Sequence, residues 1–292
     1  MKRSLRNVII ITLAIPALII PANAYSQRKA KAVPAKGGIK LGYNIPEGRP
    51  LSYSNVSNVA QTMDYNGQTM QANVHSVLAC TITGKGKENG NIKLEVLIDT
   101  MKQVVDTPQG SAGGLMNDAM GKTFAMTLSV SGKEVDLSDA EKIAVNNESI
   151  QTNASQSFLE FFPNLPLNAI KPGDTWVTND TISTKSGTFS MAATVKADNK
   201  YVGMEKVDGF DCAKITSILE GTREQTARTM GMDVATSGKF TGTAELYFAV
   251  KEGYYIKSTS NGKMTGTIEI GGAQNISMPL VSDMTTVSRL KK

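Results

Sequence analysis

Apolar and polar residues alternate with a period of two along most of the chain that follows Tyr43. Residues 92–98, 124–130 and 263–270 each place Ile, Leu, Val, Met or Phe on one face and mostly Lys, Glu, Thr, Ser or Ala on the other. This alternation is typical of strands that bury one face. The chain is therefore predicted to be mainly β.

Short turn signals separate several of these runs. Pairs that contain Gly or Asn favour tight hairpins, and a hairpin joins two antiparallel strands. The signals are Asn66-Gly67, Ser186-Gly187, Lys251-Glu252-Gly253 and Gly271-Gly272. We predict long curved antiparallel sheets that form either a half-open barrel or two related β units with a short helical connection.

One segment interrupts the alternation. Ser138-Asp139-Ala140-Glu141 has the form of a helix capping box, and helix-spaced apolar residues continue to Phe162 before Pro163 and Pro166. We predict a first β region at 43–136, a helical connection at 137–166 and a second β region at 167–292 that continues the same folded unit. Pro46-Glu47-Gly48 and Lys171-Pro172-Gly173 are similar, which leaves a true duplication open.

The first 24 residues have the three parts of a signal peptide. A basic start is followed by an apolar run broken by Pro16 and by Ala22-Asn23-Ala24, which resembles a cleavage site. The run is too short for a membrane anchor, so the mature chain is expected to contain no transmembrane segment. Residues 25–42 read as a flexible basic leader. We expect export to the periplasm, with full secretion as the alternative.

Charge and cysteine content narrow the classes of partner. The formal net charge is +5, but three of the basic residues lie in the predicted signal peptide. The remaining chain is therefore close to charge balance, and nucleic acid is not an expected partner. The two cysteines, Cys80 and Cys212, allow one disulfide in an oxidising compartment. Both lie in apolar surroundings, so buried free thiols are the alternative.

Catalytic and metal-binding patterns are lacking in the sequence. His75 is the only histidine, and it lies on a predicted strand with no nucleophile motif nearby. Acidic residues at Asp198, Glu205, Asp208 and Asp211 do not have the spacing of a calcium loop. We predict a non-catalytic protein with no cofactor and no metal.

Methionine is the most distinctive residue type, with 14 in the chain. Many lie on the apolar positions of predicted strands, where flexible thioethers either fill gaps in a core or line an adaptable binding surface. Met126, Met264 and Ile268 are the candidate lining for a lipid or another hydrophobic ligand. The alternative is an envelope assembly or adaptor protein that acts through contacts with another envelope protein.

Three sequence blocks resemble exported, uncharacterised β-rich bacterial domains of the kind found in the Bacteroidota. The blocks are Phe162-Pro163-Asn164-Leu165-Pro166, residues 170–176 and residues 207–215. This resemblance implies a Gram-negative cell envelope and no particular activity. In its expected architecture the chain is also similar to the half-open barrels of LolA and LppX-like lipid carriers, a similarity of fold alone.

Overall fold

A computed structural model describes residues 37–147, 150–229, 231–272 and 275–291. The predicted signal peptide and most of the predicted leader lie outside the described residues. The first group of strands is β1 (Pro50–Tyr65), β2 (Gln68–Glu88), β3 (Asn91–Thr107), β4 (Gly110–Leu115), β5 (Thr123–Leu128) and β6 (Glu134–Asp136). The second is β9 (Thr175–Ser186), β10 (Phe189–Val207), β11 (Phe210–Thr229), β12 (Met232–Ala249), β13 (Tyr254–Ile270) and β14 (Ile276–Leu290).

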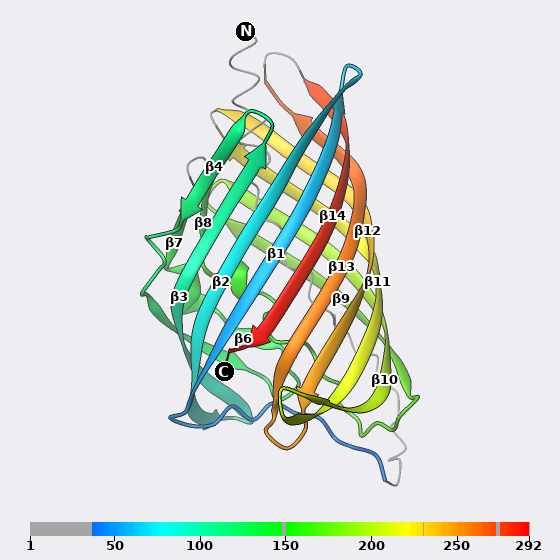
Figure 1. Ribbon diagram of the computed structural model, residues 1–292. Coiled ribbons are helices and arrows are strands. Elements are labelled where there is room, and N and C mark those ends of the chain that lie inside the picture. The colour runs from blue at the N-terminus through cyan, green and yellow to red at the C-terminus, as the bar shows by residue number, and fades with distance from the viewer. Residues whose placement is uncertain (1–36, 148–149, 230, 273–274, 292) are drawn as a thin grey trace.

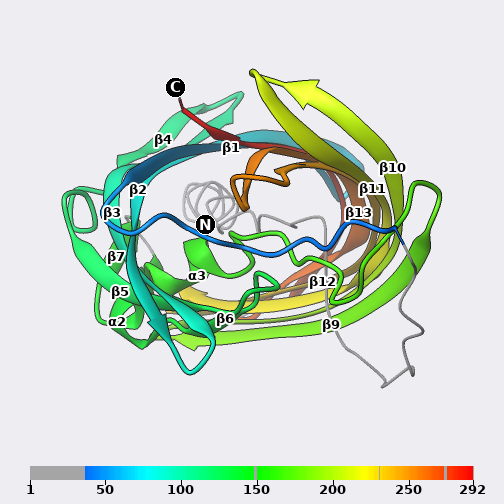
Figure 2. The same cartoon turned by 90° about the horizontal axis from the view of Figure 1, so that it is seen from below.

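These twelve strands form one antiparallel sheet. Its order is β6-β5-β3-β2-β1-β14-β13-β12-β11-β10-β9, with β4 beside β3, so the first and last long strands pair at its centre. The sheet curves strongly on itself but is not closed (Figures 1 and 2). The mainly β fold and its half-open form are confirmed, and the two β regions belong to a single sheet.

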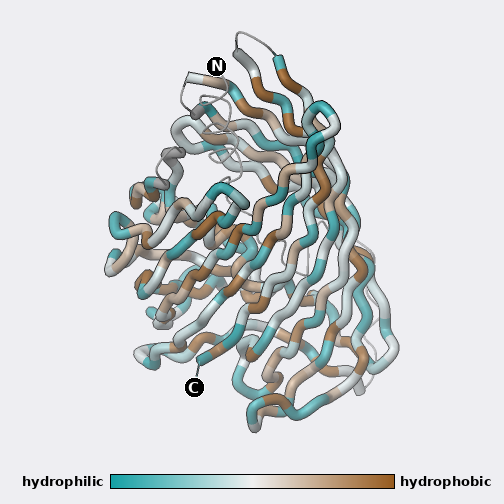
Figure 3. The backbone as a smooth tube through the Cα atoms, turned by 45° about the horizontal axis from the view of Figure 1, so that its top comes forward, coloured by the Kyte–Doolittle hydropathy of each residue, from teal (hydrophilic) through white to brown (hydrophobic). Residues whose placement is uncertain are grey.

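The predicted hairpins are present at the expected turns. Asn66 and Gly67 both have positive φ, 52° and 75°, as a type I′ turn requires. The turns at 186–187, 251–253 and 271–272 join β9 to β10, β12 to β13 and β13 to β14. Hydrophilic and hydrophobic residues alternate along the long strands (Figure 3). The apolar residues of this alternation face the concave side of the sheet.

The predicted helical connection is helical only at two places. Helix α2 (Ser138–Glu141) and helix α3 (Ser155–Phe158) flank the two-stranded sheet of β7 (Ala144–Asn147) and β8 (Ile150–Asn153). Ser138 does not cap α2, because the helix begins at Ser138 itself. The N-cap position belongs to Leu137, and no side-chain hydrogen bond caps the helix. We call residues 154–170 the plug, because α3 and the apolar chain after it lie inside the curve of the sheet (Figure 2).

The predicted flexible leader extends too far. Residues 37–47 cross the end of the sheet that holds the plug (Figure 2). Ile39 pairs with Ile170, and Leu41 is buried. The hydroxyl of Tyr43 donates to the Pro163 carbonyl at 2.8 Å. The apolar side chains of this segment are ordered by packing on the plug, a contact that the local basic composition does not reveal.

The disulfide between Cys80 and Cys212 is not formed. Both cysteines are free and buried. Cys80 lies on β2 and Cys212 on β11, and four strands separate these two in the sheet. Each thiol packs in the core, and burial raises the pKa of Cys212 to about 11 and that of Cys80 further. The buried-thiol alternative is therefore the one that the structure supports.

Candidate functional site

Two apolar clusters share the concave face of the sheet. The first, which we call the aromatic core, joins the plug to the lower strand ends in Figure 1 and contains Tyr53, Phe162 and Tyr255. The second, which we call the methionine-rich face, lies toward the other strand ends. Its buried members are Val59, Met63, Ala72, Val74, Val105, Ile182, Phe189, Met191, Val195, Ala197, Leu219, Ala227, Val234, Phe240, Ala244, Ile268, Ile270, Met278 and Leu280.

A row of polar side chains separates the two clusters. Its members, which we call the polar row, lie directly opposite one another on successive strands, with Ala244 taking the position on β12. They are Gln103, Ser76, Ser57, Thr286, Ser260, Ser217 and Asn199. On each of these strands the aromatic core lies on one side of the row and the methionine-rich face on the other.

Hydrogen bonds connect members of the polar row. Ser217 donates to the Asn199 amide oxygen at 2.6 Å, and the Asn199 amide nitrogen donates to the Thr178 hydroxyl at 3.2 Å. Thr286 donates to Ser57 at 3.2 Å. Because buried polar groups cost free energy unless they are paired, this network makes a satisfied boundary inside the sheet.

The methionine-rich face consists almost entirely of strand residues. Of the plug, only Leu159 packs against it among the described residues. Met70, Met232, Met264 and Met284 are partly buried and pack against it. The structure therefore brings Met264 and Ile268 together on this face, as the candidate lining requires. Met126 lies elsewhere, on β5 in the aromatic core, because β5 pairs with the half of β3 that faces the plug.

Glycines shape the centre of this face. Gly238 and Gly266 lie opposite each other on β12 and β13, next to the row that holds Phe240 and Met264. A Cβ atom at Gly238 would lie 2.7 Å from the terminal methyl of Met264. The Met264 side chain thus covers a strip that has no side chains of its own. Because a thioether chain is flexible, this cover can move.

Two polar groups on the same face are buried without a hydrogen-bond partner. They are the Gln61 amide oxygen and the Ser282 hydroxyl, on residues directly opposite each other on β1 and β14. Ser282 is only 6% exposed. Buried unpaired polar atoms are costly in a dry core, so they indicate a position that a ligand or water satisfies.

A basic side chain also reaches this face from β11. Arg223 occupies the next inward-facing position of β11 after Leu219 and Gly221. Its guanidinium donates to the Gln225 amide oxygen at 2.5 Å. Burial lowers the pKa of Arg223 to about 10, which still leaves it charged at neutral pH. Sequence reasoning missed this residue, although a cation on the apolar beat of an alternating strand was a visible signal.

Three carboxyl groups meet between the plug and the sheet. Phe162 donates its backbone N–H to a Glu134 carboxyl oxygen at 3.4 Å. Burial raises the pKa of Glu134 to about 8 and that of Glu160 well above its ordinary value, and the Glu160 carboxyl is hydrogen-bonded to Asp180. Burial thus favours the neutral form of both carboxyl groups where the plug meets the sheet edge.

The titratable residues singled out from the sequence lie away from the concave face. His75 is on the outer face, where its Nδ1 lies 2.7 Å from the Asn58 amide oxygen. Asp198 forms an ion pair with Lys196 at 3.3 Å. Glu205 forms an ion pair with Lys214 at 3.5 Å, and Asp208 forms one with Arg289 at 2.7 Å. Asp211 is exposed. The structure does not bring these acidic residues together.

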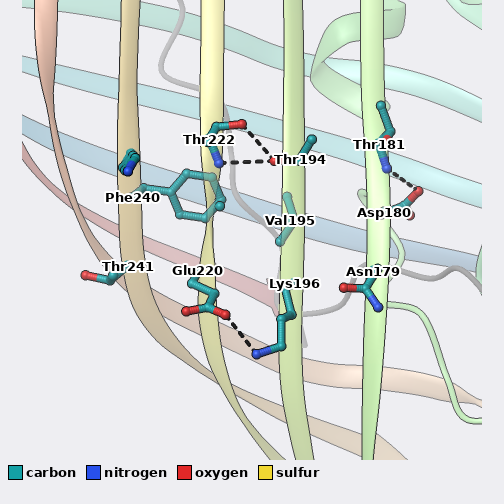
Figure 4. A pocket seen from close by; sticks show the side chains of 12 residues that line it. Asn179, Asp180, Thr181, Thr194, Val195, Lys196, Glu220, Thr222, Phe240 and Thr241 are labelled. Atoms are coloured by element: carbon teal, nitrogen blue, oxygen red, sulfur yellow. Dashed lines mark hydrogen bonds and ion pairs between the residues drawn. The ribbon is translucent and has the colours of Figure 1, made fainter.

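The outer face carries a shallow hollow of about 600 Å³ across β9 to β12. Figure 4 shows its walls, where Lys196 pairs with Glu220 at 2.8 Å and Thr194 bonds Thr222 at 2.7 Å. Lys196 and Glu220 are thus paired with each other. The hollow offers no reactive constellation.

No group of three or more His, Cys, Asp or Glu side chains suited to a metal ion occurs in the described parts of the chain. None of the helices in those same parts is long and apolar enough to cross a membrane.

Comparisons with known proteins show no family. No protein-family model and no curated protein matches the chain. DynF from the dynemicin pathway of Micromonospora chersina aligns with 92% of this chain and 96% of its own, at 7% identity and a TM-score of 0.27. Pseudomonas aeruginosa OccK2, solved with glucuronate, aligns over 84% and 99% at 8% identity and a TM-score of 0.28.

A DUF1329 family protein from Desulfovibrio piger aligns over 80% of this chain and 83% of its own, at 11% identity and a TM-score of 0.13. These similarities are too weak in identity and in superposition to carry an argument about function. The similarity to LolA-like carriers stays a prediction, and the chain's own geometry has to support any proposed role.

Proposed function

We propose that this chain is an exported, non-catalytic protein of the cell envelope that holds an apolar or amphiphilic molecule on its methionine-rich face. The observation that carries the proposal is a second apolar cluster on the concave side of the sheet, to which, among the described residues, the plug adds only Leu159. Ligand sites are typically concave and mostly apolar, with few polar groups. The polar, ion-paired outer face points the same way, because it leaves the inner face as the surface for an apolar ligand.

The composition of this face also supports a binding role. Seven methionines of the described chain belong to it or pack against it, and methionine adapts to ligands of different shape. The glycine strip under Met264 adds room for an inserted chain. The unpaired Gln61 and Ser282 groups add polar contacts that a folded core alone would not retain.

Native mass spectrometry of protein purified gently from its own host tests the proposal. We expect a bound apolar molecule that solvent extraction releases and that can be identified. Met264→Trp fills the glycine strip and is expected to lower the bound fraction at least severalfold. Thr265→Trp is the matched control, because Thr265 is the next residue on β13 and is exposed on the outer face.

An empty wild-type protein that also fails to take up molecules from a host lipid extract would overturn the proposal. A protein partner that copurifies with the empty chain would instead favour the adaptor alternative. One feature suited to such a partner is the edge strand β9, which in the described part of the chain pairs with β10 alone. Strand addition at an open sheet edge is a common mode of protein recognition.

A further inference from the structure

We propose that the molecule on the methionine-rich face is an anionic single-chain amphiphile whose carboxylate binds Arg223 and Gln225 and whose chain crosses the Gly238–Gly266 strip. This inference rests on the proposed function and deepens it, because it names the chemical class of the ligand. The class follows from charge complementarity and from the line of two glycines that the flexible Met264 side chain covers.

The charge argument starts from Arg223. Among the described strand positions that face the methionine-rich cluster, Arg223 is the one basic residue. A guanidinium offers planar, two-point recognition of a carboxylate, and its pairing gains strength in apolar surroundings. Gln225 is 5% exposed and lies two residues further on the same inward face. The Gln225 amide nitrogen belongs to the same hydrogen-bonded pair as Arg223, and a carboxylate oxygen can accept a hydrogen bond from it.

The path of the chain follows from the strand register. Arg223 lies opposite Gly238, which lies opposite Gly266, which lies opposite Leu280, which lies opposite Met63. Neighbouring strands are about 4.8 Å apart, so this cross-strand line is about 19 Å long. It begins at a cation, crosses two positions without side chains and ends on two buried apolar residues. That order matches a long acyl chain with a charged head.

The second, independent observation is the unpaired pair Gln61 and Ser282. These residues lie two positions from Met63 and Leu280 on the same strands and the same face. Ser282 is more than nine-tenths buried, and its hydroxyl has no partner. An acyl chain offers these atoms no hydrogen bond, so a water that enters beside the apolar end of the path would satisfy them.

The test compares oleate with oleyl alcohol, which have the same chain and differ in the charge of the head group. Both are titrated into the delipidated protein by calorimetry. We expect oleate to bind at least tenfold more tightly than oleyl alcohol. Arg223→Met is expected to reduce this ratio to about twofold or less. Arg228→Met is the matched control, because Arg228 is exposed on the outer face of the same strand and pairs with Asp233 at 3.6 Å.

Each outcome separates this inference from the proposed function. Equal affinity of the wild-type protein for the two molecules overturns the anionic head group but leaves apolar binding in place. An unchanged oleate preference in a folded Arg223→Met variant also overturns it. Binding of neither molecule counts against the proposed function itself. The wild-type ratio needs no variant, so the inference stays open to refutation even if Arg223→Met does not fold.

Discussion

The two ends of the concave face are built from the same strands but from different side chains. Among the described residues, eleven buried aromatic side chains belong to the aromatic core, whereas the methionine-rich face has two, Phe189 and Phe240. The aromatic core is also tied by buried hydrogen bonds, such as Tyr53 to the Tyr255 carbonyl at 2.9 Å. Among the described residues, buried polar atoms without a partner occur on the methionine-rich face, at Gln61 and Ser282, and also in the plug, at Gln156.

This difference shows how one sheet serves two purposes. Aromatic rings packed edge to face hold a fixed geometry, because ring contacts and hydroxyl hydrogen bonds both depend on orientation. Methionines, by contrast, fill irregular space and tolerate rearrangement. We infer that the plugged end supplies most of the stability of the fold. The methionine-rich end is then free to adapt to an occupant.

The largest expected effect is on the aromatic core. Phe162 is fully buried, and its ring meets Tyr43 at 5.4 Å and Phe161 at 5.5 Å between centroids. Phe162→Ala should lower the free energy of unfolding by about 3–5 kcal/mol, because it leaves a cavity among rigid rings. Urea unfolding monitored by circular dichroism measures this loss.

Phe240→Ala is the matched change on the methionine-rich face. Phe240 is 3% exposed, and its ring lies over Gly221. We expect a loss of about 1–3 kcal/mol, smaller than the Phe162 effect, because the methionines around it can move into the space. Equal losses at the two positions would mean that both ends are rigid cores, and the comparison would fail.

The next prediction concerns how pH acts on the plug. Burial raises the pKa of Glu134 to about 8, so the folded chain keeps a proton that the unfolded chain releases near its ordinary value. The stability of the wild-type protein should therefore fall as the pH rises through this window and level off above about 8. The glutamine of Glu134→Gln cannot ionise. Between acidic and alkaline pH this variant should therefore lose less free energy of unfolding than the wild type, and the difference should be on the order of 3 kcal/mol.

Thermal unfolding at a series of pH values measures this difference. Glu141→Gln is the control, because Glu141 lies on α2 and is exposed. It should leave the pH dependence unchanged. A Glu134→Gln variant with the same pH profile as the wild type would show that Glu134 is not protonated in the folded protein, and that the plug is held in another way.

The sequence predicted the strands and hairpins because their signals are local. Alternation depends on the next residue but one, and an Asn66-Gly67 turn needs only its own two positive φ angles. The half-open form was likewise expected from long alternating runs. The positions of Met264 and Ile268 on one face also followed from their spacing on one strand.

The remaining features depend on contacts between distant parts of the chain. Met126 has the same local pattern as Met264, but the strand partner of β5 places it in the aromatic core. Leu41 looks like part of a flexible leader until it packs on the plug. Arg223 could have been noticed as a cation on an apolar beat, but only the register across β12 and β13 connects it to the glycine strip.

The last expected effect on stability is at the boundary between the two ends. Asn199 is 1% exposed and joins Ser217 to Thr178 in the polar row. Asn199→Ala leaves both hydroxyls without this partner, and we expect a loss of about 1–3 kcal/mol in the free energy of unfolding. Ser190→Ala, which removes a hydroxyl bond to Thr226 on the outer face of the same strand, should cost less than about 0.5 kcal/mol.

The consequence for binding decides what the polar row does. If the row limits how deeply an apolar chain reaches toward the plug, replacing Asn199 by leucine removes that limit. Asn199→Leu should then keep the oleate preference set by Arg223 while it improves the affinity for longer acyl chains relative to shorter ones. Calorimetry with saturated carboxylates of increasing length measures this shift. An unchanged length profile would mean that the row only satisfies buried polar groups, and that the aromatic core itself stops the chain.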